Sequence, residues 1–168
     1  MGPNTSTSDT RTVLDGIRRL VQSLRESSRW AEKHVGMSGA QLFVLQKLAE
    51  GPGASLNELA ARTHTHQSSV STIIARLVEK GLVVRRRSPS DGRSVTLTLS
   101  PRGQRVGDRS PNAAQERLIA GIERLSAARR RALASALGAL GDAMDAADPE
   151  PAMFFEERGP KRRSPKHA

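Results

Sequence analysis

The sequence predicts a mainly α fold that carries one small antiparallel β-sheet. Apolar residues recur at helical spacing in several stretches, and one later stretch alternates apolar and polar residues. Aromatic residues make up only 2% of the 168 residues, so the core has to be built from Leu, Val, Ile and Ala, which suits packed helices. This length fits one domain with an appended arm.

Charge and cysteine content narrow the classes of function. Lys and Arg exceed Asp and Glu by 27 to 17, a net charge of +10, which favours nucleic acid or another anionic surface as the partner. The chain has no Cys, which excludes disulfides, thiol redox sensing and cysteine-ligated metal. No signal peptide is visible, and no run approaches the roughly 18 apolar residues of a spanning helix. We therefore expect a cytoplasmic protein without a membrane partner.

The first two helices follow from apolar spacing. Residues 1–9 are rich in Ser, Thr, Gly and Pro and are expected to be flexible. Residues 10–33 are expected to form a long helix, because apolar residues recur there every three or four positions. This stripe consists of Val13, Ile17, Leu20 and Leu24. Ser38 can cap a second helix, which ends at the Gly-Pro-Gly of residues 51–53.

The next two helices are predicted to form a helix-turn-helix. Ser55 and Glu58 have the spacing of a capping box, so a short helix begins there and ends near His64. The following helix has a complete apolar stripe, made of Val70, Ile73, Ile74, Leu77 and Val78. Its other face is polar but uncharged until Arg76. This face consists of Gln67, Ser68, Ser71 and Thr72, with Ser69 near its border.

A helix face of Gln, Ser and Thr differs from an ordinary solvated face, which would carry Glu and Lys. Short polar side chains can approach another surface closely and offer hydrogen-bond donors and acceptors. Base edges and phosphates in a DNA major groove require such groups. The face therefore predicts contact with DNA.

The residues after this helix predict a β-ribbon. Gly81 ends the helix, residues 82–87 read as a strand, residues 88–92 have turn chemistry, and residues 95–99 alternate with period two. Helix, turn, helix and ribbon together make a winged helix-turn-helix over about 38–100. Residues 60–105 hold nine Arg or Lys against two acids, a local net charge of +7. Most of the excess charge thus lies on the predicted DNA-binding part.

The stretch ELAARTHTHQSSVSTIIARLVEKGLVVRRRSPSDGRSVTLTLSPRG resembles the DNA-binding lobe of the MarR family of bacterial transcription regulators. The resemblance extends over about residues 37–103. It implies a sequence-specific regulator of double-stranded DNA, most often a repressor, that acts as a homodimer on a pseudo-palindromic operator. The family-like domain would span 10–147, and its dimer helices would be about 10–33 and 101–147.

The C-terminal part supports dimerisation independently. Ser126 can cap a helix with an apolar stripe at Leu133, Leu137, Leu140 and Met144. This stripe and that of the first helix have to be buried, either within one chain or against a second copy. Residues 148–168 are rich in Pro and charge and are expected to be largely disordered. The three consecutive apolar residues Met153, Phe154 and Phe155 either dock on the dimer or belong to that disordered tail.

Contact roles follow for two elements. On the second helix of the helix-turn-helix the expected DNA-contacting residues are Gln67, Ser68, Ser69, Ser71, Thr72 and Arg76. The resemblance implies that Arg93 enters the minor groove and that Asp91 orients basic residues of the wing; Asp91 can equally be a turn-forming residue. Arg86 and Arg87 alternate faces on their strand, so only one of the two is expected to point to DNA.

His66 occupies the position where the N-cap of that helix is expected, although many family members have Asp or Ser there. A neutral imidazole can accept an amide hydrogen bond, and a protonated one would favour a bound phosphate. We hypothesise that this makes operator affinity rise modestly at acidic pH. His64 and His66 do not have the spacing of a metal site, and neither a catalytic motif nor a cofactor motif is present, so we expect no enzyme.

Relatives in the family often bind small aromatic or phenolic anions between the dimer helices and the DNA-binding lobe. Trp30, His34 and Phe43 fall near that junction in the sequence and are candidates for contact with an effector; a core Trp and a surface His are the alternative. Two other functions stay open. One is a non-specific architectural DNA-binding protein, and the other is a winged-helix module for protein interaction.

Overall fold

The computed structural model describes residues 4–51, 53–87, 95–144, 151 and 153–156. Within them the elements are, in order, α1 (Asn4–Val35), α2 (Gly39–Ala49), α3 (Leu56–Arg62), α4 (Gln67–Glu79), β1 (Val83–Arg87), β2 (Val95–Leu99), α5 (Pro101–Arg109), α6 (Ala114–Glu123) and α7 (Ala127–Ala143). The two strands pair antiparallel, with Val83 opposite Leu99 and Arg87 opposite Val95. The predicted fold, mainly α with a small antiparallel β-wing, is confirmed.

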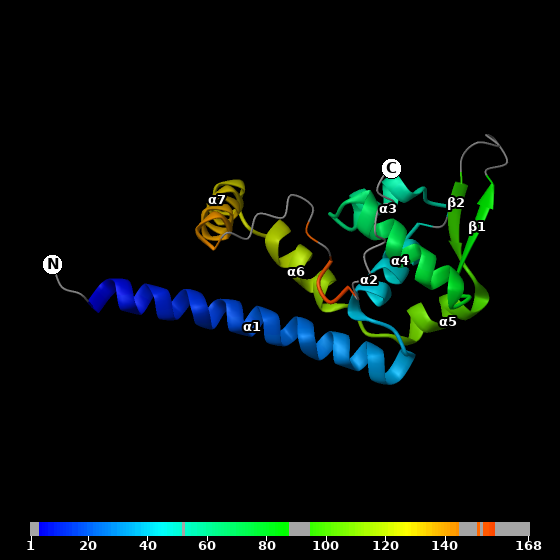
Figure 1. Ribbon diagram of the computed structural model, residues 1–168, viewed down its shortest axis with the longest axis horizontal. Helices are drawn as coiled ribbons and strands as arrows, with labels where there is room; N and C mark the ends of the chain where they lie inside the picture. The colour runs from blue at the N-terminus through cyan, green and yellow to red at the C-terminus, as the bar shows by residue number, and fades with distance from the viewer. Residues whose placement is uncertain (1–3, 52, 88–94, 145–150, 152, 157–168) are drawn as a thin grey trace, which may run out of the picture.

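Two parts of the molecule are visible in Figure 1. The elements α2, α3, α4, β1 and β2 form a close-packed unit, which we call the lobe, and α5 packs against it. The helices α1, α6 and α7 form what we call the arm, and much of α1 and all of α7 project away from the lobe. No helix among the described residues combines the length and apolar character that a membrane crossing requires.

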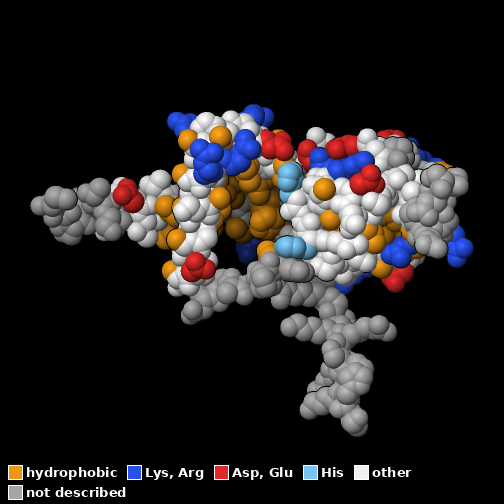
Figure 2. All heavy atoms as spheres, turned by 90° about the horizontal axis from the view of Figure 1, so that it is seen from above, with side chains coloured by type: hydrophobic (Ala, Val, Ile, Leu, Met, Phe, Trp, Pro, Cys, Tyr) orange, Lys and Arg blue, Asp and Glu red, His pale blue; other side chains and the backbone are white. Residues whose placement is uncertain are grey.

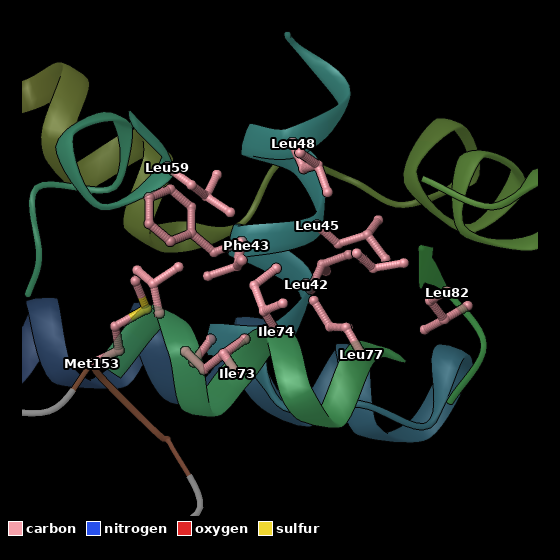
Figure 3. Packing of buried hydrophobic residues seen from close by; sticks show 14 of the residues in the cluster. Leu42, Phe43, Leu45, Leu48, Leu59, Ile73, Ile74, Leu77, Leu82 and Met153 are labelled. Carbon is pink, nitrogen blue, oxygen red and sulfur yellow. The ribbon is translucent and has the colours of Figure 1, made fainter. Parts of the chain in front are cut away.

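The hydrophobic core lies mainly in the lobe. Its largest fully buried side chains are aliphatic apart from Phe43, as the low aromatic content predicts; they include Leu42, Leu45, Leu48, Leu59, Ile73, Ile74, Leu77 and Leu97. In Figure 3 the side chains of α2 and α4 face one another across this core. Burial of the aliphatic side of α4 leaves its polar side outward, so the core itself orients the predicted DNA-contacting face.

The predicted helix starts at Ser38, Ser55 and Ser126 are confirmed. Ser55 Oγ accepts from the Glu58 backbone N at 3.2 Å, and the Glu58 carboxylate accepts from the Ser55 backbone N at 2.7 Å. This backbone hydrogen bond, with a second one from the Ser55 hydroxyl, lowers the pKa of Glu58. Such a cap contributes about 0.5–2 kcal/mol to helix stability. The short α3 is therefore fixed at its start and holds the turn before α4.

One boundary differs from the prediction. The helix α1 starts at Asn4 rather than at residue 10, so residues 4–9 are helical. Extending an existing helix by one residue costs far less free energy than nucleating a new helix. The polar residues 4–9 can therefore extend the helix that the apolar residues further along stabilise. Within residues 101–144, part of the range assigned to dimer helices, α5 stops before Pro111, which has no N–H to donate, and α6 and α7 follow.

Polar contacts join the lobe to the arm where α2 meets the segment between α5 and α6. The Gln46 side chain donates to the Pro111 carbonyl at 3.0 Å and accepts from the Ala113 N–H at 3.1 Å. Lys47 Nζ lies 2.6 Å from Glu116 Oε2 of α6. That buried oxygen has no well-aligned hydrogen bond, so the charge of Lys47 compensates its burial.

The Lys47 side chain is only 12% exposed. Burial alone would lower the pKa of Lys47, but contacts with Glu116 and Glu50 outweigh it, and the pKa is raised. Lys47 therefore stays charged and ties α2 to α6. We call the region where α1, α2 and α6 meet the joint.

Gly103 of α5 lies against the backbone at the start of the wing. A Cβ at this position would collide with the carbonyl oxygen of Leu82. Ser100 fixes the approach, because its Oγ accepts from the Gly103 N–H at 3.0 Å and donates to the Gly81 carbonyl at 2.7 Å. The backbones of α5 and the wing can therefore pack this closely only because residue 103 has no side chain.

We expect Gly103→Ala to lower the free energy of unfolding by about 1–3 kcal/mol, since the backbone has to move to admit a methyl group. Urea unfolding followed by circular dichroism measures this change. Gly121→Ala is the matched control, because nothing lies within 4 Å of a Cβ at that helical position. The control should be neutral or gain up to about 1 kcal/mol from helix propensity. Equal stability of both variants would show that the contact at Gly103 can relax without cost.

Candidate nucleic-acid interface

The polar face of α4 is brought to the surface as predicted. Gln67, Ser68 and Thr72 are exposed, whereas Ser71 and Arg76 are half-buried. Thr72 Oγ donates to the Ser68 carbonyl at 3.2 Å, which holds this hydroxyl close to the helix. The result is a shallow strip of small polar groups along one side of α4, with a guanidinium further along.

Ser69 does not belong to this strip. It is 9% exposed and lies on the side of α4 that also holds Val70 and Ile73. At 100° per residue, position 69 falls between the exposed face and the buried stripe, and the packing of the core turns it inward. Ser69 is therefore removed from the set of residues expected to reach DNA.

Residues 63–66 form the turn between α3 and α4. The buried Thr63 closes the end of α3 with a hydrogen bond from its hydroxyl to the Leu59 carbonyl at 2.8 Å. His64 follows with φ 50°, in the left-handed region that non-glycine residues seldom adopt. Its Nε2 lies 3.7 Å from Glu123 Oε1 of α6, so the turn reaches the arm as well as α4.

His66 is the N-cap of α4, where the sequence predicts it, and its backbone is extended. Its side chain is exposed and makes no capping hydrogen bond, so the imidazole does not take the role of Ser or Asp. It stands instead at the N-terminal end of α4, where the helix dipole favours anions.

The wing carries three exposed arginines on β1, Arg85, Arg86 and Arg87. Arg86 pairs with Thr96 and Arg87 with Val95 of β2, so successive arginines point to opposite sides of the ribbon. Asp91 and Arg93 lie outside the described residues, and their roles in the wing stay predictions.

The strip on α4 and the arginines of β1 supply two complementary kinds of contact. Amide and hydroxyl groups can hydrogen-bond to base edges, and guanidinium groups can pair with phosphates. The N-terminal end of α4 adds a partial positive charge. The arrangement can therefore hold a duplex by its backbone while α4 approaches the bases.

The three residues considered for an effector take different places. The rings of Trp30 and His34 stack, with centroids 4.7 Å apart and planes at 15°, at the C-terminal end of α1. Phe43 is only 1% exposed and lies in the core (Figure 3). Phe43 is a core residue in this conformation, so contact between it and a small molecule would require the core to open.

Sequence reasoning left open where Met153, Phe154 and Phe155 lie. Met153 is 6% exposed and belongs to the core cluster, while the two Phe side chains stay partly exposed. The only sequence signal was three consecutive large apolar residues in a charged stretch. Such a cluster does not indicate which surface of the protein it packs against.

Comparison with known proteins agrees with this geometry. Residues 35–94 match the sequence profile of the MarR family. The HTH-type transcriptional repressor Rv2887 of Mycobacterium tuberculosis is 31% identical over 128 residues, which cover 74% of this chain and 90% of that protein.

Two solved structures share the fold. BpsR of Bordetella bronchiseptica, whose DNA binding is regulated by 6-hydroxynicotinic acid, is 25% identical with a TM-score of 0.52, over 77% of this chain and 98% of that one. The reduced form of MarR from E. coli is 20% identical with a TM-score of 0.51, over 78% and 94%. With a relative matched over nearly its whole length and a winged helix-turn-helix in place, the chain belongs to the MarR family of transcription regulators.

Proposed function

We propose that this regulator is a homodimeric repressor that binds a pseudo-palindromic operator through α4 and the wing. The observation that carries the proposal is the pairing of a polar, exposed strip on α4 with an arm on which several large apolar side chains are exposed among the described residues. In a dimer with twofold symmetry, two copies of α4 would reach half-sites about one helical turn, or ~34 Å, apart.

Exposed apolar residues at two of the three arm helices, α1 and α7, support dimerisation. Leu20 of α1 is 52% exposed, and Leu137 and Met144 at α7 are 55% and 68% exposed. None of the residues of α7 is buried. Figure 2 shows a hollow between arm and lobe whose walls are largely hydrophobic. A second copy of the arm would cover these surfaces. We therefore propose that residues 10–33 and 101–147 supply the dimer helices.

The proposed base contacts come from the start of α4. Gln67 is exposed at its first position and has the side chain that pairs with adenine by two hydrogen bonds. Ser68, Ser71, Thr72 and Arg76 would add contacts to bases and phosphates. His66 would meet a phosphate at the helix end.

The test combines operator discovery with a substitution. Footprinting on genomic fragments should reveal a protected palindrome, whereas diffuse protection would indicate an architectural protein and contradict the proposal. Gln67→Ala should then weaken operator binding about 5–150-fold, the equivalent of ~1–3 kcal/mol for one bidentate contact, with little change on unrelated duplexes. Gln104→Ala, an exposed Gln on α5, is the matched control and should bind like the unchanged protein.

A small aromatic or phenolic anion is proposed as the effector. The support is the regulation of BpsR by 6-hydroxynicotinic acid, together with the stacked Trp30 and His34 at the end of α1, next to the joint. Such a ligand releases DNA only if it binds better to a conformation that does not fit the operator. A site between arm and lobe would meet this condition if a bound ligand changed the angle between them.

A further inference from the structure

The segment 153–156 forms a compact turn that is held by hydrogen bonds between its own residues. The Glu156 backbone N–H donates to the Met153 carbonyl at 3.1 Å, and the Met153 N–H donates to the Glu156 carboxylate at 3.2 Å. Phe155 adopts φ 58° within this turn. A non-glycine residue in the left-handed region needs its surroundings to hold it there, so the turn is shaped by what it packs against.

Met153 enters the core of the lobe. In Figure 3 its side chain lies at the end of the cluster that holds Phe43 and Ile73, which come from α2 and α4. With 6% of its surface exposed, the thioether is buried as deeply as many core leucines are in proteins. The long, flexible side chain of Met suits an irregular gap between elements.

The two Phe residues of the same segment cover the arm side of the joint. Phe154 and Phe155 border a hollow of about 10 Å³ together with Leu24 of α1, Gly39 of α2 and Ala114 of α6. The Phe pair therefore lies at the joint, beside residues of all three helices that meet there. One short stretch of chain thus joins the core cluster through Met153 and borders α1 and α6 through its Phe pair.

We propose that residues 153–156 are an intramolecular anchor that locks the lobe against the arm and so fixes the orientation of α4. The position of the arm determines where the second copy of α4 lies in a dimer. A locked joint presents both copies at one spacing, whereas a loose joint has to be ordered when the operator binds. The C-terminal segment therefore controls affinity for the paired half-sites without touching DNA. The part that concerns the operator rests on the proposed function.

Two backbone amides report on the joint without DNA. The Gly39 N–H donates to Ser28 Oγ of α1 at 3.2 Å, and the Ala114 N–H donates to Ser27 Oγ of α1 at 3.0 Å. In Met153→Asp we expect hydrogen exchange at both amides to speed up at least ten-fold. The Leu59 amide, bonded to the Ser55 carbonyl at 3.0 Å within the lobe, should change less than two-fold. Met153→Leu should keep the exchange rates of the unchanged protein.

Two truncations separate the anchor from the basic tail and guard against misfolding of Met153→Asp. Removal of residues 151–168 should speed exchange at Gly39 and Ala114, and removal of 158–168 should not. The first truncation and Met153→Asp should weaken binding to the palindromic operator at least five-fold, with less than a two-fold change on a single half-site.

Unchanged exchange in both Met153→Asp and the longer truncation overturns the anchor. Faster exchange with equal or tighter operator binding overturns its control of DNA affinity. If no palindrome binds the unchanged protein, the proposed function fails, and the exchange rates alone decide whether the segment locks the joint.

Discussion

Leu137→Glu is expected to convert the protein into a monomer and to weaken operator binding about 10²–10⁴-fold. Leu137 is 55% exposed in the single chain and lies in the apolar stripe of α7. In the dimer the Glu carboxylate would be buried against the second copy without an opposite charge beside it. The free energy gained on association would not offset the cost of burying that charge. A monomer has only one copy of α4 and the wing, so it loses the gain in affinity that a dimer obtains by binding two half-sites on the same DNA.

Sedimentation and operator titration of the same sample measure this prediction. Ser135→Glu is the matched control, since Ser135 is an exposed residue of α7 outside the stripe. It should remain dimeric and bind the operator normally. A Leu137→Glu protein that still sediments as a dimer would place the subunit interface elsewhere, and a monomeric unchanged protein would end the homodimer proposal.

The sequence was sufficient for elements whose signals are local. The helix cap at Ser38, the capping box at Ser55 and the period-two strand at 95–99 each depend on residues within a few positions, and the structure has all three. The polar face of α4 follows from the same kind of local pattern. Local agreement of propensity, caps and stripes is what lets a short stretch specify its own structure.

The features that the sequence left open or placed differently depend on distant packing. Ser69 looks polar and near-surface in a helical projection, yet the core between α2 and α4 draws it inward. Residues 4–9 look like a loose end, yet they continue α1. Met153 is buried by surfaces from other parts of the chain, and no spacing rule connects it to Phe43. The sequence could not predict the joint, because contacts such as Gln46 with Pro111 and Ser27 with Ala114 join residues 65 and 87 positions apart.

The dependence of DNA binding on salt is expected to be steep. A dimer with this charge that pairs about 6–10 phosphates should bind its operator roughly 10³–10⁵-fold more weakly at 200 mM than at 50 mM salt, because bound phosphates release condensed counterions. Fluorescence anisotropy over a series of salt concentrations gives the slope of log affinity against log salt. A slope near zero would mean that the basic lobe does not meet the phosphate backbone.

The same slope decides which side of the wing faces DNA. Arg86 and Arg87 are both exposed on β1 and point to opposite sides of the ribbon, so each is a matched control for the other. Replacement by Ala of the arginine that meets a phosphate should lower the slope by about one per lost contact and weaken binding to all sequences alike, and the other replacement should leave both unchanged. Equal effects of Arg86→Ala and Arg87→Ala would contradict the view that only one side of the ribbon lies against the duplex. In that case the wing would have to enter a groove with phosphates on both sides of it.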